Sequence, residues 1–348
     1  MSVARVAVIG GGIIGCAIAW RLAQRGVQVV VIDANTPVSK ASWAAAGMLL
    51  PILEDPSPLR PLAAASFAEF PAFVAEVTQA TGIDAGLIIE GPHSGSVDNR
   101  RLGTALRHAA TGAGAEFRIG VPARKVECTS HFRHVELADG SSIEGDGVVI
   151  AAGAWSSEIL GLPVRLPVVP VRGQMLAVKH DPPFVEKIVE GERCYLVPRG
   201  DRLLIGATVE RVGFDERTTP DGIAGLLQCA RELAPRVADM EVLETWAGLR
   251  PGTPDDLPIL GADPRVEGLF YATGHYRNGI LLTPITARAI SELIVSGKTD
   301  VNLRRFNIDR FVVDVDHPHC DLCGAAMTEW HCRIICTGCG YQRDCSDP

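Results

Sequence analysis

Continuous runs of aliphatic residues, each about as long as a β-strand, alternate along the chain with segments of helical character. Residues 6–9 and 29–32 are two such runs, and a helical segment over residues 16–25 lies between them and ends at Gly26. Later runs within residues 148–155 and 269–275 have the composition of strands buried on both faces, which is typical of parallel sheets. The pattern predicts an α/β fold whose parallel sheet the chain leaves and later rejoins.

Two longer helices are predicted by apolar residues at helical spacing, over residues 60–81 and 99–112. The apolar positions expected in the core are Leu62, Phe67, Phe70, Phe73, Val74 and Val77 in the first helix and Leu102, Leu106 and Ala109 in the second. Three β-rich segments follow, at residues 117–126, 132–137 and 142–150, with an Asp139-Gly140 turn among them. They predict a small antiparallel excursion.

A second sheet is predicted within residues 164–250, before the chain returns to the first sheet. Its strands are expected at residues 173–178, 193–197, 202–208 and 241–249, with one helix at residues 221–233.

A glycine-rich turn follows the first predicted strand. Gly10, Gly12 and Gly15 form a Gly-x-Gly-x-x-Gly pattern, and Asp33 ends the second strand. In a β-α-β unit, such glycines allow a tight turn, a close approach of backbone to a pyrophosphate and close helix packing, while the helix N-terminus attracts anions. Asp33 is placed to accept hydrogen bonds from ribose hydroxyls. The combination predicts a dinucleotide site; the alternative is a plain connecting turn.

The segment over residues 42–48 is rich in small residues. Such residues let a backbone pass close beneath a flat ligand, and Gly47 can adopt backbone angles that are closed to other residues. The same composition equally suits the start of an alanine-rich helix, so both interpretations stay open.

Composition and charge exclude several classes of protein. The chain has 348 residues, of which 47% are hydrophobic and 21% charged, which suggests a globular protein of about two domains. No apolar stretch is long enough for a membrane span and the first strand begins at once, so we expect a cytoplasmic protein without a signal peptide or a membrane partner. The formal net charge of −8 gives no reason to expect nucleic acid as a partner.

Cysteines are concentrated near the C-terminus, where six of the ten lie after residue 319. Four of them have the paired spacing of a zinc ribbon, which holds Zn²⁺ through four thiolates. Disulfides are disfavoured in the expected compartment, so we predict structural zinc, with free or redox-active cysteines as the alternative. The predicted zinc ligands are Cys320, Cys323, Cys336 and Cys339, with His331 or Cys332 as conceivable substitutes.

This tail is acidic, because from residue 312 onward it has two basic and six acidic side chains. Its charge argues against nucleic-acid binding, a common role of zinc ribbons. We expect the tail to dock on its own substrate domain, on a neighbouring subunit of a homo-oligomer, or on a partner protein.

Several motifs together resemble one enzyme family. They are the glycine turn with Asp33, residues 42–48, residues 149–155, residues 194–199, residues 246–253 and residues 274–280. This set is similar to the FAD-dependent D-amino-acid oxidase superfamily and, within it, to the glycine oxidases of thiamine biosynthesis. The similarity covers residues 1 to about 311. It implies a Rossmann-like FAD-binding domain interleaved with a substrate domain that has a mixed, largely antiparallel sheet.

The resemblance also implies domain boundaries and an activity. The FAD-binding domain would comprise residues 1–50, 95–160 and 251–311, the substrate domain residues 51–94 and 161–250, and the zinc-ribbon-like tail residues 312–348. The enzyme would move a hydride from the α-carbon of glycine, sarcosine, D-alanine or an N-substituted glycine to the flavin. Oxygen would then take the electrons, and the products would be an imine or glyoxylate, ammonia and hydrogen peroxide.

Individual residues acquire roles through the same resemblance. Arg250 would hold the substrate carboxylate through two parallel hydrogen bonds, Tyr195 would face the substrate, and Arg277 would lie at the entrance. A structural ion pair for Arg250 and a core position for Tyr195 are the alternatives. His275 is expected to be structural, and FAD to be bound non-covalently because no cysteine lies near Arg250 or Gly274. The expected cofactor-binding residues are Gly10, Gly12, Ile13, Ile14, Gly15, Asp33, Ser42, Ala45, Ala46, Gly47, Met48, Val126, Gly153, Arg277, Asn278, Gly279, Ile280 and Leu281.

One segment departs from the family pattern. Around residues 86–95 the chain is much shorter than the resemblance leads us to expect, as though most of a β-α excursion of the substrate domain were missing. A more open active site would suit N-substituted glycines or larger amines. The second functional hypothesis is therefore a flavin-binding scaffold, or an oxidase of a larger amine, whose zinc tail recruits a partner.

Overall fold

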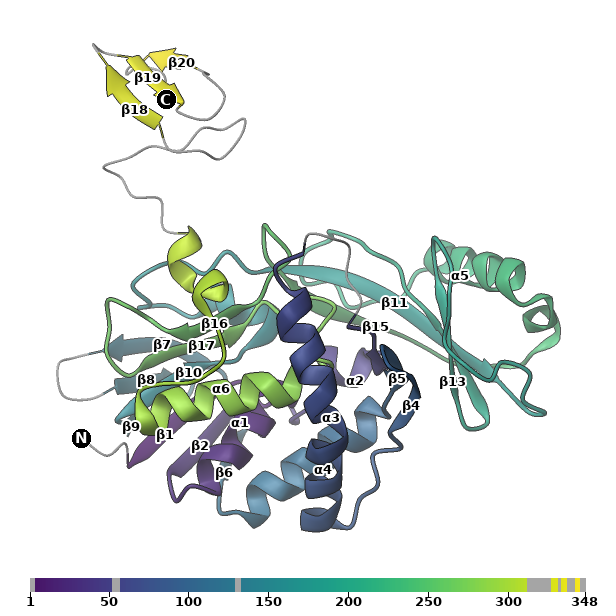
Figure 1. The fold of residues 1–348 in the computed structure, drawn as a ribbon, viewed down its shortest axis with the longest axis horizontal. Coiled ribbons are helices and arrows are strands. Elements are labelled where there is room, and N and C mark those ends of the chain that lie inside the picture. Colours follow the sequence, from purple (N-terminus) through teal and green to yellow (C-terminus); the bar gives the residue numbers. More distant parts are fainter. Residues whose placement is uncertain are drawn as a thin grey trace. The chain divides into compact units, whose positions relative to one another are not determined.

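The computed structural model describes residues 4–51, 57–128 and 133–311, together with three short strands within residues 327–344 (Figure 1). The chain divides into two compact units, Met1–Asn307 and Ile308–Pro348. Each unit is described separately. No helix among the described residues is long and apolar enough to cross a bilayer.

A six-stranded sheet forms the base of the larger unit. Its order is β16-β17-β10-β1-β2-β6, and the five strands from β17 to β6 run parallel. Only β16 is antiparallel to its neighbour. The strands are β1 (Arg5–Ile9), β2 (Gln28–Asp33), β6 (Glu116–Ile119), β10 (Gly147–Ile150), β16 (Ile259–Ala262) and β17 (Leu269–Thr273). The predicted return of the chain to a parallel sheet is confirmed.

Residues 117–126 do not form one antiparallel strand, as the sequence predicts. They divide into β6, which is the outermost parallel strand, and β7 (Ala123–Cys128). Gly120 at a positive φ of 84°, followed by Pro122, breaks the run, because this backbone turn cannot continue a ladder. Strand β7 does pair antiparallel with β8 (Arg133–Leu137), and β8 with β9 (Ser142–Gly145), so the predicted excursion exists but is smaller.

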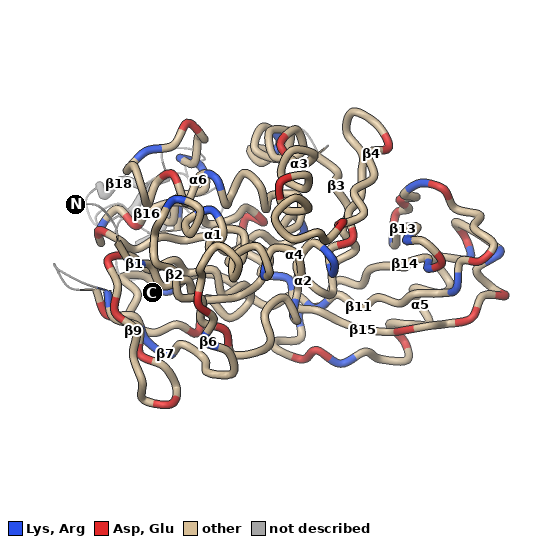
Figure 2. The backbone as a smooth tube through the Cα atoms, turned by 90° about the horizontal axis from the view of Figure 1, so that it is seen from below, with Lys and Arg blue, Asp and Glu red and all other residues tan. Residues whose placement is uncertain are grey.

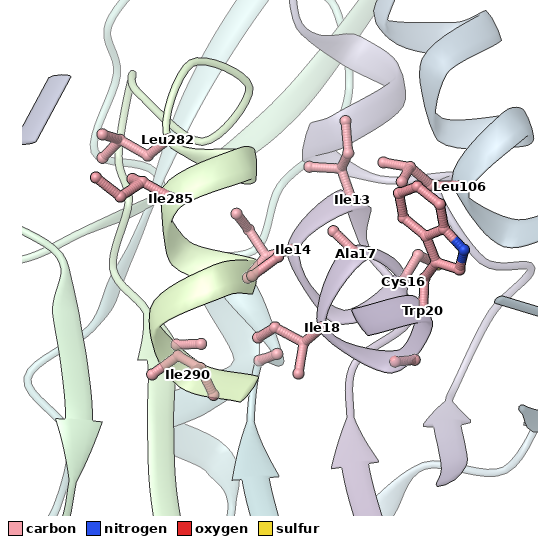
Figure 3. Close-up of a cluster of buried hydrophobic side chains, with 14 of the residues drawn as sticks. Ile13, Ile14, Cys16, Ala17, Ile18, Trp20, Leu106, Leu282, Ile285 and Ile290 are labelled. Atoms are coloured by element: carbon pink, nitrogen blue, oxygen red, sulfur yellow. The ribbon is translucent and has the colours of Figure 1, made fainter. Parts of the chain in front are cut away.

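Helix α1 (Ile13–Ala23) packs between two other helices against the parallel sheet. These are α4 (Asn99–Gly112) and α6 (Thr283–Ser296). Figure 3 shows Ile14 and Ile18 directed toward α6, while Trp20 lies beside Leu106 of α4. Because α1 contacts neighbours on several sides, nine of its eleven residues are buried, which explains why its apolar residues are not confined to one stripe.

Helix α3 (Arg60–Thr81) forms where apolar periodicity predicts it, and Phe70, Phe73 and Val77 are buried. It ends at Gly82, whose positive φ of 72° provides the usual left-handed cap. The expected domain boundaries assign this helix to the substrate domain, but it packs against α4 and α6 and shares their hydrophobic cluster.

A second, fully antiparallel sheet has the order β12-β13-β14-β11-β15. Its strands are β11 (Val169–Lys179), β12 (Val189–Glu190), β13 (Tyr195–Arg199), β14 (Arg202–Gly206) and β15 (Val242–Gly252). Helix α5 (Pro220–Leu233) covers one face, where alternate residues such as Leu176, Leu196 and Ile205 are buried with it. The opposite face carries Met175, Tyr195 and Trp246 and packs against the single helical turn α2 (Ala41–Ala44).

Between α3 and α4 the chain makes only a short hairpin. Strands β4 (Ile88–Gly91) and β5 (Ser94–Ser96) pair with each other, and β5 also pairs with β3 (Met48–Leu49). Asp98 then caps α4 by accepting hydrogen bonds from the N–H groups of Arg100 and Arg101. No larger excursion occurs between residues 82 and 98, all of which the structure describes.

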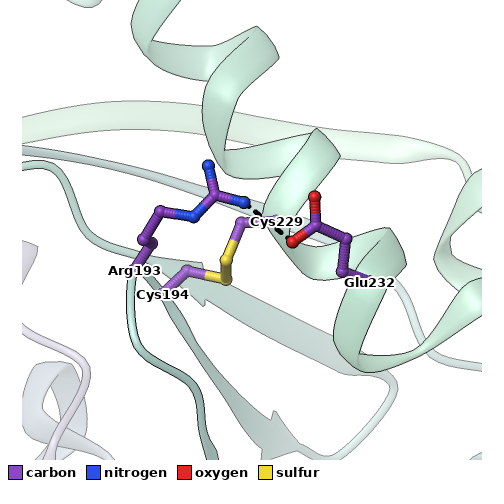
Figure 4. Close-up of a disulfide and its surroundings, with 4 residues drawn as sticks. All are labelled: Arg193, Cys194, Cys229 and Glu232. Atoms are coloured by element: carbon purple, nitrogen blue, oxygen red, sulfur yellow. Dashed lines mark hydrogen bonds and ion pairs between the residues drawn. A yellow bond between two sulfur atoms is a disulfide. The ribbon is translucent and has the colours of Figure 1, made fainter.

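Cys194, just before β13, and Cys229 of α5 form a disulfide with a Cα–Cα distance of 6.2 Å (Figure 4). The expectation that disulfides are disfavoured is wrong for this pair, which no sequence pattern predicts. The two cysteines are 35 residues apart and meet only because α5 packs over the antiparallel sheet.

The smaller unit has an antiparallel sheet of three strands, β18 (Met327–Trp330), β19 (Arg333–Cys336) and β20 (Gln342–Asp344). Of the four predicted zinc ligands, Cys336 ends β19, while Cys320, Cys323 and Cys339 lie outside the described residues. Among the residues that the structure describes, no group of three or more His, Cys, Asp or Glu side chains is arranged to hold a metal.

Candidate functional site

A pocket of about 670 Å³ opens where the parallel strands end and the second sheet faces them. The carboxyl ends of β1, β2, β10 and β17 contribute to its wall, as is usual for ligand sites in α/β folds. The inner face of the antiparallel sheet supplies the opposite wall through Met175, Tyr195 and Arg250. The pocket therefore joins the predicted nucleotide site to the predicted substrate site.

The glycine turn is built so that backbone, and no side chain, faces the pocket. Gly10 has a positive φ of 109°, and a Cβ there would lie 2.3 Å from the carbonyl oxygen of Ala151. A Cβ at Gly15 would lie 1.9 Å from the carbonyl oxygen of Gly10. Any larger residue would push α1 away from the sheet, so both glycines set the close approach of the helix N-terminus to a ligand.

The N-terminus of α1 retains free hydrogen-bonding capacity. The N–H of Ile13 donates to the Ser42 hydroxyl at 2.9 Å, whereas the N–H of Ile14 has no acceptor within the helix and lines the pocket. Together with the helix dipole, this suits a pyrophosphate.

Asp33 lies at the end of β2 in the pocket wall. Its two carboxylate oxygens accept hydrogen bonds from the N–H of Gly11 at 2.6 Å and of Asn35 at 2.8 Å. These bonds orient the side chain, and each oxygen keeps a further lone pair for a hydroxyl donor. Burial nevertheless raises the pKa of Asp33 above its usual value. The carboxylate is thus held in the position expected for binding the ribose of a dinucleotide.

The two interpretations of residues 42–48 concern different parts of the segment: a helical turn begins it, and binding beneath a flat ligand stays a prediction for the rest. Residues 41–44 form the helical turn α2. Ala44 packs so closely against Gly248 that a Cβ added at Gly248 would lie 2.5 Å from the Cβ of Ala44. Gly47, in contrast, has a positive φ of 72°, and a Cβ there would lie 1.9 Å from the carbonyl oxygen of Val97. The segment is therefore locked against the rest of the fold while Ala45, Ala46 and Met48 line the pocket.

Arg250 is a guanidinium without a counterion in the pocket wall. Its Nη1 donates to the carbonyl oxygens of Thr208 at 3.0 Å and Arg172 at 3.5 Å, and no described carboxylate pairs with it. Burial lowers its pKa, because desolvation disfavours the charged form. A buried positive charge that is not neutralised is costly, so the site favours an anionic ligand. The structural ion pair considered as an alternative is absent from the described residues.

Tyr195 lies beside Arg250 on the same face of the antiparallel sheet. It pairs with Gly206 of β14, which pairs in turn with Met175 of β11, and residues paired in this way project from one face. Burial raises the pKa of Tyr195, so its phenol remains a neutral hydrogen-bond donor at physiological pH.

Two glycines that sequence reasoning missed make this arrangement possible. A Cβ at Gly173 would lie 2.4 Å from the Arg250 guanidinium nitrogens, and one at Gly206 would lie 2.7 Å from the Tyr195 hydroxyl. Both functional side chains thus lie flat on bare backbone of neighbouring strands. A glycine inside a strand signals such a close approach, but the sequence does not show which side chain lies over it.

Arg277 is exposed and lines the pocket, with its guanidinium 5.0 Å from the ring centroid of Tyr276. His275 is buried, and its Nε2 lies 3.2 Å from the Thr286 hydroxyl. Burial lowers the pKa of His275 to about 3, so the imidazole is neutral at physiological pH. A neutral, hydrogen-bonded ring fits the structural role that we predict for it.

Most of the predicted cofactor-binding residues line the pocket, including Ser42, Gly153 and the run from Arg277 to Leu281 just before α6. Two do not. Gly15 lies behind the pocket wall, where it allows α1 to pack closely against the glycine turn. Val126 is fully buried, and its N–H donates a hydrogen bond to the carbonyl oxygen of Leu160. Lys40 and Trp155 line the pocket but were not singled out from the sequence.

Comparison with known proteins is consistent with this geometry. The family model DAO, described as FAD dependent oxidoreductase, matches residues 5–92 and 81–293. The glycine oxidase of Geobacillus kaustophilus is 34% identical, over 88% of this chain and 97% of that protein. The bifunctional protein ThiO/ThiG of Synechocystis sp. is 37% identical over 90% of this chain. The chain spans only 55% of the length of that bifunctional relative.

Solved structures show the same relationship. The crystal structure of glycine oxidase from Geobacillus kaustophilus superposes with a TM-score of 0.84 at 33% identity, covering 89% of this chain and all of that one. Iminodiacetate oxidase from Chelativorans sp. superposes with a TM-score of 0.77 at 26% identity, covering 87% of this chain and 98% of that one.

The alignments also bear on the shortened segment. The match to the Geobacillus kaustophilus protein runs over 368 positions but uses only 88% of the 348 residues here, so about 60 positions have no residue in this chain. The two matches to the family model meet at residues 81–92, where the structure has only the β4–β5 hairpin. By its sequence, its fold and its glycine-lined pocket, the chain belongs to the DAO family of FAD-dependent oxidoreductases.

Proposed function

We propose that this protein is an FAD-dependent oxidase of glycine or a related small amino acid. The observation that carries the proposal is the half-buried guanidinium of Arg250, which no described carboxylate neutralises and which lies beside the Tyr195 hydroxyl in the same pocket as the glycine turn. A small carboxylate is the ligand that this pair suits best, because a guanidinium and a carboxylate can form two parallel hydrogen bonds. Glycine oxidase relatives support the choice of substrate class.

The residues of the chain orient the substrate. Arg250 would bind the carboxylate, Tyr195 would donate a further hydrogen bond to it, and exposed Arg277 would flank the entrance. FAD would be held by the glycine turn, Asp33 and residues 277–281, and it would supply the two-electron acceptor for hydride transfer from the α-carbon. Fixing the carboxylate positions the α-carbon, which is the main contribution that a protein makes to such a reaction. We expect an imine or glyoxylate, ammonia and hydrogen peroxide as products, with oxygen as the acceptor and FAD bound non-covalently.

The proposal is tested by the visible spectrum of the purified protein under anaerobic conditions. Glycine, sarcosine and D-alanine are added in turn, and at least one should abolish the oxidised flavin band. Arg250→Ala should retain FAD while kcat/KM falls by about 10- to 100-fold, the usual effect of losing a charge-assisted hydrogen bond. Arg217→Ala, which removes an exposed arginine, is the control. A flavin band that persists with all three amines would contradict the proposal.

A second candidate function is an oxidase of a larger amine, or a flavin-binding scaffold with little turnover. The roughly 60 alignment positions without a residue in this chain favour it, together with the break in the family match at residues 81–92, which the proposed boundaries assign largely to the substrate domain. N-Substituted glycines separate the two ideas: an oxidase with an open site should be reduced by them, whereas a scaffold should not respond to any amine.

We further propose that Cys320, Cys323, Cys336 and Cys339 bind one structural Zn²⁺ in the C-terminal unit. Their spacing and the antiparallel strands β18 to β20 support a ribbon of this kind. Chelation should release about one zinc per chain and leave the flavin spectrum unchanged; loss of FAD with the zinc would instead implicate the tail in cofactor binding. The tail is proposed to recruit a partner or a second subunit, and supply of the imine to thiazole synthesis would agree with the ThiO/ThiG relatives.

A further inference from the structure

A disulfide lies one residue away from the proposed substrate-binding tyrosine. Because side chains alternate along a strand, Cys194 projects to the outer face of the antiparallel sheet and Tyr195 to the inner face. Cys194 is bonded to Cys229 of α5 on that outer face (Figure 4). Any movement of Cys194 is therefore passed through one peptide unit to Tyr195.

The turn between β12 and β13 is held against one face of α5 by three contacts. Besides the disulfide, Arg193 pairs with Glu232 at 2.7 Å, and Gly191 lies so close to Leu233 that a Cβ there would be 2.8 Å from its Cδ2. Residues 229, 232 and 233 are neighbours on one helix face. The ion pair is exposed on both sides and contributes little, so the disulfide is the main tether.

Other contacts also restrain this edge of the sheet. Strand β12 is two residues long and forms the outer edge, where Val189 packs on the hydrophobic cluster of α5. The N–H of Gly191 donates to the carbonyl oxygen of Cys194 at 2.8 Å, and the Glu90 carboxylate accepts a hydrogen bond from the N–H of Ile188 at 3.3 Å. The disulfide is the covalent restraint among them. Residues 190–195 line the pocket, so the position of this edge sets the shape of the wall beside Tyr195.

We propose that Cys194 and Cys229 are a reversible redox site, oxidised by hydrogen peroxide, whose disulfide form holds Tyr195 in place for carboxylate binding. The source of the peroxide rests on the proposed oxidase function. Cys194 is among the residues that line the pocket where the peroxide would form, while its side chain, like that of Cys229, is buried beneath α5 on the other face of the sheet.

Formation of the disulfide consumes two thiols and one molecule of hydrogen peroxide. The Cys194 thiol loses its proton, its thiolate attacks peroxide, the O–O bond breaks, and the hydroxide that leaves takes up that proton, so a sulfenic acid and one water form. The sulfur of Cys229 then attacks the sulfenic sulfur, the S–S bond forms and the S–O bond breaks, and the hydroxide that leaves takes the proton of the Cys229 thiol as a second water. Two thiols are thus oxidised while one hydrogen peroxide is reduced to two waters. An external dithiol returns the pair to thiols by thiol–disulfide exchange and is itself oxidised to a disulfide.

The test compares the holoenzyme in its two redox states. One sample is treated with hydrogen peroxide and another with dithiothreitol, each reagent is removed by gel filtration under argon, and alkylation with mass spectrometry counts thiols at Cys194 and Cys229. In the reduced sample we expect the KM for glycine, and the Kd for acetate from perturbation of the flavin spectrum, to rise about three- to tenfold with kcat within about twofold.

Variants separate this pair from the other cysteines. Cys229→Ser should have the KM for glycine and the Kd for acetate of the reduced parent enzyme, and neither peroxide nor dithiothreitol should change them. This variant retains Cys194 and eight other cysteines, so a lack of response assigns the effect to the Cys194–Cys229 pair. Cys128→Ser removes a half-buried free thiol elsewhere and should behave like the parent. If Cys229→Ser does not fold, the two forms of the parent protein decide the question alone.

Two results would overturn the proposal: a pair that stays reduced after peroxide treatment, or a reduced enzyme whose KM and acetate Kd equal those of the oxidised one. Acetate cannot be oxidised at an amine, so its Kd reports the site without turnover. A redox-dependent Kd without glycine oxidation would support the redox site and contradict the proposed function; glycine oxidation with no redox dependence would do the reverse.

Discussion

The positions of individual side chains at this site depend on the backbone against which they pack. Arg250 has no described counterion, and its guanidinium lies on the bare backbone of Gly173. The positions of its neighbours are therefore as important as the charge itself, since a displacement of about 1 Å at a binding group can reduce catalysis by about 100-fold.

Gly173→Ala tests that dependence. The new Cβ would lie 2.4 Å from the Arg250 nitrogens, so the guanidinium must move and the KM for glycine should rise by at least about tenfold. The FAD content should stay the same, because Gly173 is on the substrate wall. Steady-state kinetics on the purified variant measure the effect. Gly225→Ala in α5, where a Cβ meets nothing within 4 Å, is the control, and equal KM values in the two variants would contradict the argument.

The buried imidazole of His275 predicts a dependence of stability on pH. Its pKa is lowered to about 3 in the folded state, whereas an unfolded histidine has a pKa of about 6.5, so between these values the unfolded chain binds more protons. The free energy of unfolding should therefore fall as the pH decreases through 6.5.

Urea denaturation at pH 7.5 and 5.5 measures this effect. His275 should account for about 1 kcal/mol of the difference, and His275→Gln should reduce the pH dependence by that amount. His93→Gln, at an exposed histidine, should not change it. An undiminished pH dependence in the His275 variant would show that the ring is not the group responsible.

At the level of helices and strands, the β1–α1–β2 unit carries the nucleotide site. Its glycines, its helix N-terminus and Asp33 are consecutive in sequence, and the structure places them as the pattern predicts. Local elements of this kind can be predicted because both strands, the glycine turn, the helix and the acidic residue lie within about 30 consecutive residues, although the close approach of Gly10 to Ala151 comes from the pairing of β1 with β10.

Gly15→Ala should displace α1 and weaken FAD binding. A Cβ there would lie 1.9 Å from the carbonyl oxygen of Gly10, and neither backbone segment can yield without opening the turn. The ratio of flavin to protein absorbance after purification, followed by FAD titration, should show largely apo protein. Gly112→Ala in α4, where the added methyl meets nothing within 4 Å, should keep its FAD. Full FAD retention by Gly15→Ala would remove the basis for this role of the turn.

For the protein as a whole, the short connection between α3 and α4 is the feature that bears most on access to the pocket, because the structure has only the β4–β5 hairpin there. Figure 2 shows acidic and basic residues interspersed along the described chain. The alignment with the Geobacillus kaustophilus protein leaves about 60 positions without a residue in this chain, and the two matches to the family model meet at residues 81–92, where this hairpin lies.

We expect this difference to broaden the substrate range. N-Ethylglycine and N-benzylglycine should be oxidised with a kcat/KM within about tenfold of that for glycine, because fewer residues surround the amine. The glycine oxidase of Geobacillus kaustophilus, whose alignment with this chain leaves about 60 positions without a residue here, is the comparison and should discriminate more strongly between these amines. Equal discrimination by both enzymes would show that the missing segment does not limit access.

The sequence alone was enough to predict the α/β class, the glycine turn between β1 and α1, and helices α3 and α4. These features depend on periodicity or on motifs a few residues long. The roles of Arg250 and Tyr195 follow from the family resemblance and stay predictions. Strand β6 was misassigned because its residues resemble those of the neighbouring β7, and only pairing with β2 makes it a parallel strand.

Long-range pairing determined the rest. Tyr195 and Arg250 are 55 residues apart in the chain, and the registers of β13, β14, β11 and β15 bring them to one face. The same folding places Gly173 and Gly206 beneath them and Cys229 against Cys194. A local pattern cannot encode these contacts, because each depends on which strands become neighbours and in what register.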